Sequence, residues 1–286
     1  MIIDTHTHVY DPSRPQGVPW PEPENKLLYR TVLPEHFKAL AGPHGVLGTV
    51  VVEASVWPED NQWVLDLAAR EPAIVGFVGN LDPTEQEFRD YVDRFSSNPL
   101  FRGIRVRGTG LADLLSEGPL ANLEYLAAKD LSLDVLADPD NLDSLAQLAT
   151  SIPTLRLVIN HVAHVVIDGA EPDARWQDGM DRAGQYTNVF CKVSGMVEKA
   201  VPAPASGDPE FYVPVLDALW RSFGSERLVY GSNWPVCERA ADYATVFTIA
   251  STYFRARGEE AWQNIFWKNA GAAYKWIDRL SQPGRS

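Results

Sequence analysis

The chain has 286 residues, of which 45% are hydrophobic and 22% are charged, and its formal net charge is −13. This composition is ordinary for a folded globular protein and excludes a largely disordered chain. The negative charge argues against nonspecific binding of nucleic acid, although a few inward-facing arginines would still allow an anionic substrate. We therefore expect a small-molecule substrate and no nucleic-acid partner.

Membrane and redox signals are absent from the sequence. No run of about 18 apolar residues is present, which is what a membrane-spanning helix requires. The opening residues MIIDTHTHVY are typical of a strand and not of a signal peptide. The cysteines Cys191 and Cys237 are too few for a disulfide scaffold, so we expect free thiols. These features predict a cytoplasmic protein with no membrane partner, and they leave monomer and homodimer open.

Short runs rich in β-branched residues alternate with amphipathic segments along the whole chain. The predicted strands are 1–5, 47–53, 74–80, 103–106, 131–136, 155–160, 189–193 and 227–230. Predicted helices include 60–70, 211–223, a helix opened by Asp82-Pro83 and another opened by Asp138-Pro139. Eight strands alternating with helices over about 250 residues predict a (β/α)8 TIM barrel. We expect residues 1–286 to form this α/β barrel as a single domain.

The alternative is a doubly wound open sheet. That fold carries a glycine-rich phosphate-binding turn after its first strand, whereas this chain has His6-Thr7-His8 there. Two irregular segments also interrupt the alternation, at 11–33 and 201–207. Long loops after barrel strands usually cover an active site, so both are expected over the barrel mouth.

Histidines stand where predicted strands end. His6 and His8 follow the first strand, and the two-residue period of a strand puts both imidazoles on one face, together with Asp4. His161 follows the sixth strand, and His164 lies three residues later as a substrate contact or simply a loop residue. Barrel enzymes carry their catalytic groups at these strand ends, and imidazole serves both as a zinc ligand and in acid–base catalysis.

Several motifs together resemble one family. They are D-T-H-T-H at 4–8, N-H at 160–161, K-V-S-G at 192–195 and G-S-N-W-P-V at 231–236. In this order along the chain they are similar to the amidohydrolase-2 family of the amidohydrolase superfamily. Its sugar-lactone and pyrone-dicarboxylate lactone hydrolases are the most similar branch.

The resemblance implies roles for individual residues. His6, His8 and His161 match positions that hold one divalent metal ion, most commonly zinc, in some members, while other members open lactones without metal. Binuclear relatives use a lysine on the fourth strand, which this chain lacks at 103–106, so a two-metal site is not expected. Arg105 matches an arginine that contacts the carbonyl or carboxylate of the substrate. Further candidates for substrate binding are Ser55, Tyr10, Trp234 and His164.

Asn233 departs from the family pattern. The usual residue there is an aspartate that takes a proton from the attacking water, and a neutral amide does not accept that proton. Three explanations stay open: a natural subgroup with another base, an engineered change that traps substrate, or an enzyme that has lost turnover. In the first case we expect Asn233 to orient the water and His161 to act as the base.

The sequence thus predicts a hydrolase that opens the ring ester of a small lactone. Arg105 would stabilise the developing negative charge, with or without one metal ion on the histidines. A nonoxidative decarboxylase of the same superfamily is one alternative, although the pair Trp234-Pro235 favours the lactonase branch. A catalytically silent binding protein is the other, and only Asn233 supports it.

Overall fold

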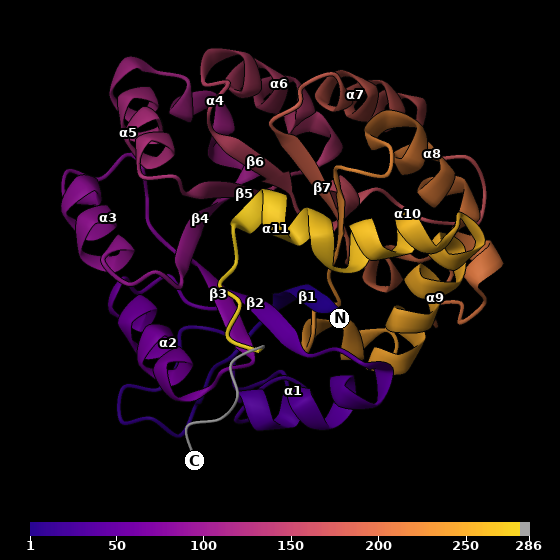
Figure 1. The fold of residues 1–286 in the computed structure, drawn as a ribbon, viewed down its shortest axis with the longest axis horizontal. Helices are drawn as coiled ribbons and strands as arrows, with labels where there is room; N and C mark the ends of the chain where they lie inside the picture. The colour runs from indigo at the N-terminus through magenta and orange to yellow at the C-terminus, as the bar shows by residue number, and fades with distance from the viewer. Residues whose placement is uncertain (281–286) are drawn as a thin grey trace.

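The computed structural model describes residues 1–280. Eight parallel strands form one sheet in chain order, and helices lie between and around them (Figure 1). The strands are β1 Ile3–Thr7, β2 Gly48–Val52, β3 Ile74–Gly79, β4 Phe101–Arg107, β5 Ser132–Leu136, β6 Arg156–Ile159, β7 Val189–Val193 and β8 Leu228–Tyr230. Each overlaps the strand predicted for it, and the (β/α)8 barrel prediction is confirmed.

Helices surround the strands as predicted, except that the helix expected to open at Asp82-Pro83 begins only at Phe88, after a turn. They are α1 Pro34–Ala41, α2 Glu59–Arg70, α3 Phe88–Ser96, α4 Leu111–Leu114, α5 Glu117–Ala128, α6 Leu142–Ser151, α7 Ala174–Gly184, α8 Val213–Phe223, α9 Tyr243–Ala256, α10 Glu259–Gln263 and α11 Asn269–Tyr274. The inner face of α6 is buried, at Leu142, Leu145, Ala146, Leu148 and Ala149. None of the helices among residues 1–280 has the length and apolar character needed to cross a bilayer.

The barrel closes between its first and last strands. The backbone nitrogen of Asn233 donates to the carbonyl oxygen of His6 at 2.9 Å, and that of His8 donates to Trp234 at the same distance. These bonds lie just beyond the end of β8, so they join the two strands at the barrel mouth. The side chains His6, His8 and Asn233 are therefore brought together by closure of the barrel.

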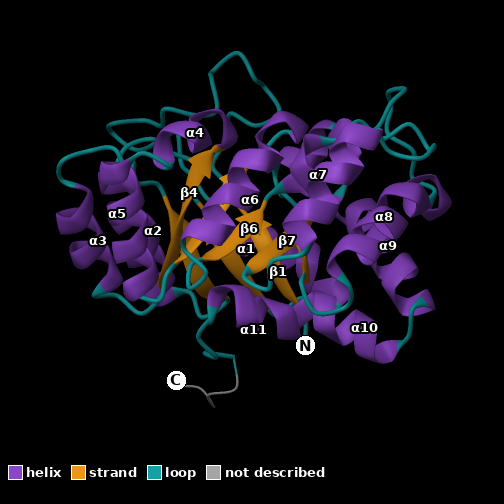
Figure 2. Ribbon diagram, turned by 90° about the horizontal axis from the view of Figure 1, so that it is seen from above, coloured by secondary structure: helices purple, strands orange, loops and turns teal. Residues whose placement is uncertain are grey.

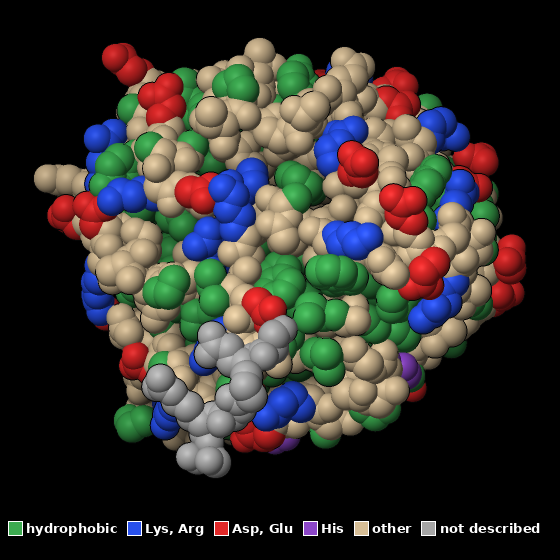
Figure 3. Space-filling model, in the orientation of Figure 1, with side chains coloured by type: hydrophobic (Ala, Val, Ile, Leu, Met, Phe, Trp, Pro, Cys, Tyr) green, Lys and Arg blue, Asp and Glu red, His purple; other side chains and the backbone are tan. Residues whose placement is uncertain are grey.

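One end of the barrel is plugged by helix α11. Ala270, Ala273 and Tyr274 pack with Ile3 and other lumen residues in one buried cluster. Figure 1 shows α11 lying across the near end of the strands, and Figure 2 shows the loops gathered at the opposite end, towards which the β4 arrow points. On the α11 side, acidic and basic side chains are scattered around central hydrophobic ones (Figure 3). The open mouth is therefore at the carboxyl ends of the strands.

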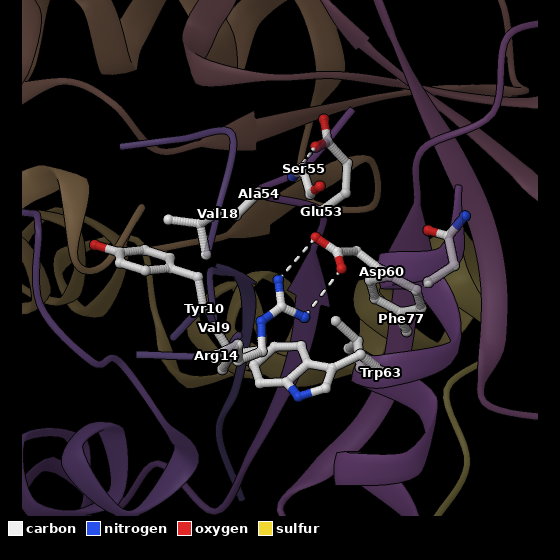
Figure 4. A pocket seen from close by; sticks show the side chains of 12 residues that line it. Val9, Tyr10, Arg14, Val18, Glu53, Ala54, Ser55, Asp60, Trp63 and Phe77 are labelled. Carbon is white, nitrogen blue, oxygen red and sulfur yellow. Dashed lines mark hydrogen bonds and ion pairs between the residues drawn. The ribbon is translucent and has the colours of Figure 1, made fainter. Parts of the chain in front are cut away.

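The two irregular segments form loops after β1 and β7, as predicted. The ends of the first loop are joined by reciprocal backbone bonds of 2.9 and 2.8 Å between Tyr10 and Val32. Its first part is held by Arg14, which binds both carboxylate oxygens of Asp60 on α2 at 2.9 and 3.0 Å and lies over the Trp63 ring (Figure 4). These contacts hold the loop against α2.

Candidate active site

His6 and His8 lie at the mouth end of β1, close to each other. Their ring centroids are 5.0 Å apart, and both side chains are buried. A register shift between Asp4 and Thr7 breaks the two-residue alternation in β1. As a result Asp4 binds the hydroxyl of Tyr243, on the outer helix α9, at 3.1 Å. The prediction that Asp4 shares a face with the two histidines is wrong, because a bulge interrupts the pleat.

His161 begins a short left-handed segment after β6. Residues His161–His164 all have positive φ angles between 47° and 53°. The His161 ring lies 4.3 Å from that of His6, and its Nδ1 is 3.0 Å from the Ser194 hydroxyl. Gly195, at φ 66°, makes this approach possible, because a Cβ there would lie 2.6 Å from the His161 Cβ. The structure thus brings together the three histidines that the sequence singled out.

A buried lysine lies under the histidines, and the sequence analysis assigned it no role although it opens the K-V-S-G motif. Lys192 on β7 donates to the Asp134 carboxylate on β5 at 2.6 Å and lies 3.1 Å from His6 Nδ1. The Lys192 and Asp134 side chains are fully buried, and the Tyr274 hydroxyl also donates to Asp134, at 3.0 Å. The signal was available, since an inward-facing lysine interrupts the otherwise apolar run 189–193.

Burial lowers the pKa of all three histidines. The pKa of His8 falls to about 3, and those of His6 and His161 fall well below 6.5. Desolvation is the largest cause in each, with nearby cations such as Lys192 adding to it for His6. All three imidazoles are therefore neutral near pH 7, so each ring has one N–H donor and one acceptor nitrogen.

The hydrogen bonds do not suit a three-histidine metal site. His8 Nδ1 donates to the carbonyl of Val52 at 3.0 Å, and the His8 side chain also hydrogen-bonds to the side chain of Asn233. At His6 the Lys192 ammonium, which can only donate, lies 3.1 Å from Nδ1, and the buried Nε2 has no hydrogen-bond partner. Among residues 1–280, no three His, Cys, Asp or Glu side chains form a group that could hold a metal ion. The predicted ligand set of His6, His8 and His161 therefore does not fit a metal here.

Arg105 reaches the mouth from β4. Its Nε donates to Glu53 Oε1 at 2.7 Å and its Nη2 to the Glu53 carbonyl at 3.0 Å. Both side chains are 14% exposed. Glu53 in turn accepts from the backbone nitrogen of Ser55 at 3.0 Å. The ion pair holds the guanidinium over the mouth, so Arg105 combines a structural contact with access to a ligand.

Asn233 is paired with a carboxylate that the sequence analysis did not identify. Its Nδ2 donates to Glu198 Oε1 at 2.6 Å, and its backbone adopts the left-handed conformation at φ 61°. Glu198 lies in the short helix Val197–Lys199, which follows β7. Burial raises the pKa of Glu198 to about 6, and the hydrogen bond from Asn233 partly opposes this effect. No periodic pattern marks this irregular segment, so nothing in the sequence pointed to Glu198.

These side chains surround a cavity of about 830 Å³. Six of the predicted site residues line it: His8, Ser55, Arg105, His161, His164 and Asn233. The two long loops also contribute, through Trp20 and Glu22 of the first and through residues 203–205 of the second. The size suits a small molecule, and the lining offers charged, polar and apolar groups.

Two predicted substrate contacts lie outside this cavity. The Tyr10 hydroxyl donates to the Leu28 carbonyl at 2.9 Å, and Figure 4 shows its ring at a separate, much smaller pocket beside Arg14. The Trp234 ring nitrogen donates to Glu238 at 2.8 Å, and Trp234 itself is only 1% exposed. Both residues anchor the loops around the mouth, and we leave them out of the proposed substrate site.

Comparison with known proteins settles the family. The amidohydrolase family model matches residues 3–276, nearly the whole chain. This chain belongs to the amidohydrolase family. It is similar to an L-fucono-1,5-lactonase from Burkholderia ambifaria, with 32% identity over 98% of this chain and 97% of that protein.

Solved structures of amidohydrolases share the fold. One, from Burkholderia multivorans and with bound zinc, has a TM-score of 0.84 at 24% identity and covers 96% of this chain and 99% of its own. A probable 2-pyrone-4,6-dicarboxylic acid hydrolase from Acinetobacter baumannii, with citric acid bound, has a TM-score of 0.76 at 16% identity, with the same coverage of both chains. The predicted placement in the lactonase branch of this family is confirmed.

Proposed function

We propose that this amidohydrolase opens the ring ester of a sugar aldonolactone to give the hydroxy acid. The observation that carries the proposal is the full-length similarity to a lactonase that acts on L-fucono-1,5-lactone. The mouth cavity supports it, because Arg105, His161 and the Glu198–Asn233 pair line one space large enough for a six-membered sugar ring. A six-carbon 1,5-lactone is therefore our first choice of substrate.

In the proposed reaction, Arg105 and His161 act on the ester carbonyl. The Arg105 guanidinium stabilises the negative charge that develops on the carbonyl oxygen as water adds to the carbon. Neutral His161 supplies a hydrogen bond without adding charge, whereas the ring proton of His8 is already donated to the Val52 carbonyl. The hydroxyl groups of the sugar find polar partners at the cavity wall in Glu22, Ser55 and Lys199. Each of these residues lies on a loop that follows a strand, where specificity changes most easily.

Zinc was the cofactor expected from the sequence, and a zinc ion occurs in one structural neighbour. The hydrogen bond from Lys192 to His6 Nδ1 opposes a three-histidine site, so we propose catalysis without a resident metal. Elemental analysis of the purified protein, combined with activity before and after treatment with EDTA, tests this point. Loss of activity on chelation and its return with zinc would refute metal-free catalysis but leave the lactonase proposal intact.

The function itself is tested by acid release in a weakly buffered pH-indicator assay. The panel contains 1,5- and 1,4-aldonolactones of deoxy sugars, hexoses and pentoses, with spontaneous hydrolysis subtracted. We expect turnover of six-carbon 1,5-lactones and slower turnover of lactones derived from shorter sugars. Release of carbon dioxide from aromatic carboxylates would favour the decarboxylase instead. Saturable binding of lactones without any turnover would favour a silent binding protein, and either result would overturn the hydrolase proposal.

A further inference from the structure

The mouth lacks a base at the position where the family resemblance expects one. The side-chain amide of Asn233 does not take a proton from water near pH 7. His161, the base expected from the sequence, is poorly suited, because burial and neighbouring cations hold its pKa well below 6.5. A general base works best when its pKa lies near the working pH. Another group is therefore needed to activate the water.

Glu198 lies beside Asn233 and faces the same cavity. Its Oε1 accepts the Asn233 amide at 2.6 Å, whereas its Oε2 is buried and has no hydrogen-bond partner. A buried carboxylate oxygen without a partner is costly in a folded protein and indicates a site for a donor such as water. Arg105 and His161 line the cavity together with Glu198, so a lactone carbonyl held by them would have the carboxylate at the same opening.

The surroundings of Glu198 keep its carboxylate basic. Arg239 and Cys237 approach from the segment Val236–Arg239, Tyr212 from the segment Pro209–Tyr212, and Lys199 from the next position in the chain. Burial is the largest influence and raises the pKa of Glu198 to about 6, against the smaller effects of its own backbone N–H, Asn233, Arg239 and Lys199. At pH 7 to 8 the group is thus mostly ionised and still a better base than a surface glutamate.

We propose that Glu198 is the general base of this enzyme and that Asn233 positions its carboxylate, an inference that rests on the proposed lactonase function. Glu198 takes one proton from a water molecule while the water oxygen forms a bond to the lactone carbonyl carbon. The tetrahedral intermediate then collapses, the bond between the carbonyl carbon and the ring oxygen breaks, and Glu198 returns the proton to that oxygen. The product is one open-chain hydroxy acid, so the water is fully accounted for.

Asn233 is well held for this positioning role. Its backbone nitrogen donates to His6 at 2.9 Å, and its carbonyl accepts from Cys237 at 3.0 Å. The side-chain amide is therefore fixed at the end of β8 and donates to one carboxylate oxygen of Glu198, which leaves the other oxygen for water. Compared with the family pattern, the carboxylate lies on the loop after β7, and an amide lies at the end of β8 where the carboxylate is usually found.

A swap of the two side chains tests the proposal. Glu198→Gln keeps the shape and still accepts the Asn233 amide, but it removes the base. Asn233→Asp with Glu198→Gln restores one carboxylate on the other side of the same contact. Glu210→Gln, at an exposed glutamate twelve residues further along the chain, is the matched control. The lactone found for the wild-type protein is the substrate, and kcat and KM are measured from pH 4.5 to 9.

We expect Glu198→Gln to lower kcat by about 10²- to 10⁴-fold with KM within a few-fold, and to remove the acidic limb of the pH profile near 6. The double variant should regain most of this loss, whereas Asn233→Asp alone should be harmful at neutral pH because two adjacent carboxylates share a proton. Wild-type activity and pH profile in Glu198→Gln would overturn the inference while leaving the lactonase intact. The inference would also be overturned if Glu198→Gln and the double variant were equally inactive while their circular dichroism spectra showed that both are folded. Absence of lactone turnover by the wild-type protein would instead refute the proposed function.

Discussion

The buried pair of Lys192 and Asp134 gives the sharpest test of how this barrel interior is built. Substitution Lys192→Met keeps the length of the side chain but leaves the Asp134 carboxylate buried without its cation. Breaking a buried ion pair in this way costs about 3–5 kcal/mol of folding free energy. Asp134 keeps hydrogen bonds from Tyr274 at 3.0 Å and from Asn160 at 3.0 Å, so we expect a value near the lower end, about 3 kcal/mol.

The double variant Lys192→Met with Asp134→Asn removes both charges. Replacement of a whole buried pair by neutral groups is often close to neutral for stability. We therefore expect the double variant to be more stable than Lys192→Met by about 2 kcal/mol or more, measured by equilibrium urea unfolding at pH 7. Lys275→Met is the control, since its ion pair with Asp130 is half exposed and should contribute less than about 1 kcal/mol. A double variant as unstable as Lys192→Met alone would refute the paired-charge reasoning.

Three further predictions follow from other contacts. The folded-state pKa of Glu198 lies at about 6, above its usual 4.5. Glu198 therefore does not destabilise the fold below pH 4.5, where it is protonated in both states, and the protein loses stability as the pH rises through 6. Glu198→Gln should therefore be more stable than wild type by about 2 kcal/mol at pH 8 and equal to it at pH 4, in thermal or urea unfolding. Arg14→Leu leaves Asp60 unpaired under the first loop and should lower the unfolding free energy by about 3 kcal/mol. It should also raise KM more than it lowers kcat. Unchanged stability and kinetics would show that other contacts hold the loop. Arg105→Lys loses the planar fork and should reduce kcat/KM by about 10- to 1000-fold; unchanged kinetics with a lower Tm would assign Arg105 to its ion pair with Glu53 alone.

The barrel and the place of its mouth were predictable from the sequence. Apolar runs of β-branched residues alternated with helical stripes, and these local periods are enough to predict eight parallel strands. Parallel strands in a barrel all end at one rim, so residues that follow different strands meet there. For this reason His8, His161 and Asn233 were expected together, and they line one cavity.

The chemistry of the site depended on contacts that no local pattern records. A bulge turns Asp4 away from the histidines, Lys192 from β7 donates to the ring of His6, and Glu198 meets Asn233 across the mouth. The two hydrogen bonds join segments far apart in the chain, and they determine which nitrogen of His6 accepts and which side chain lies against Asn233. Periodicity reports the face on which a residue lies, whereas barrel closure and burial determine its partners and therefore its pKa.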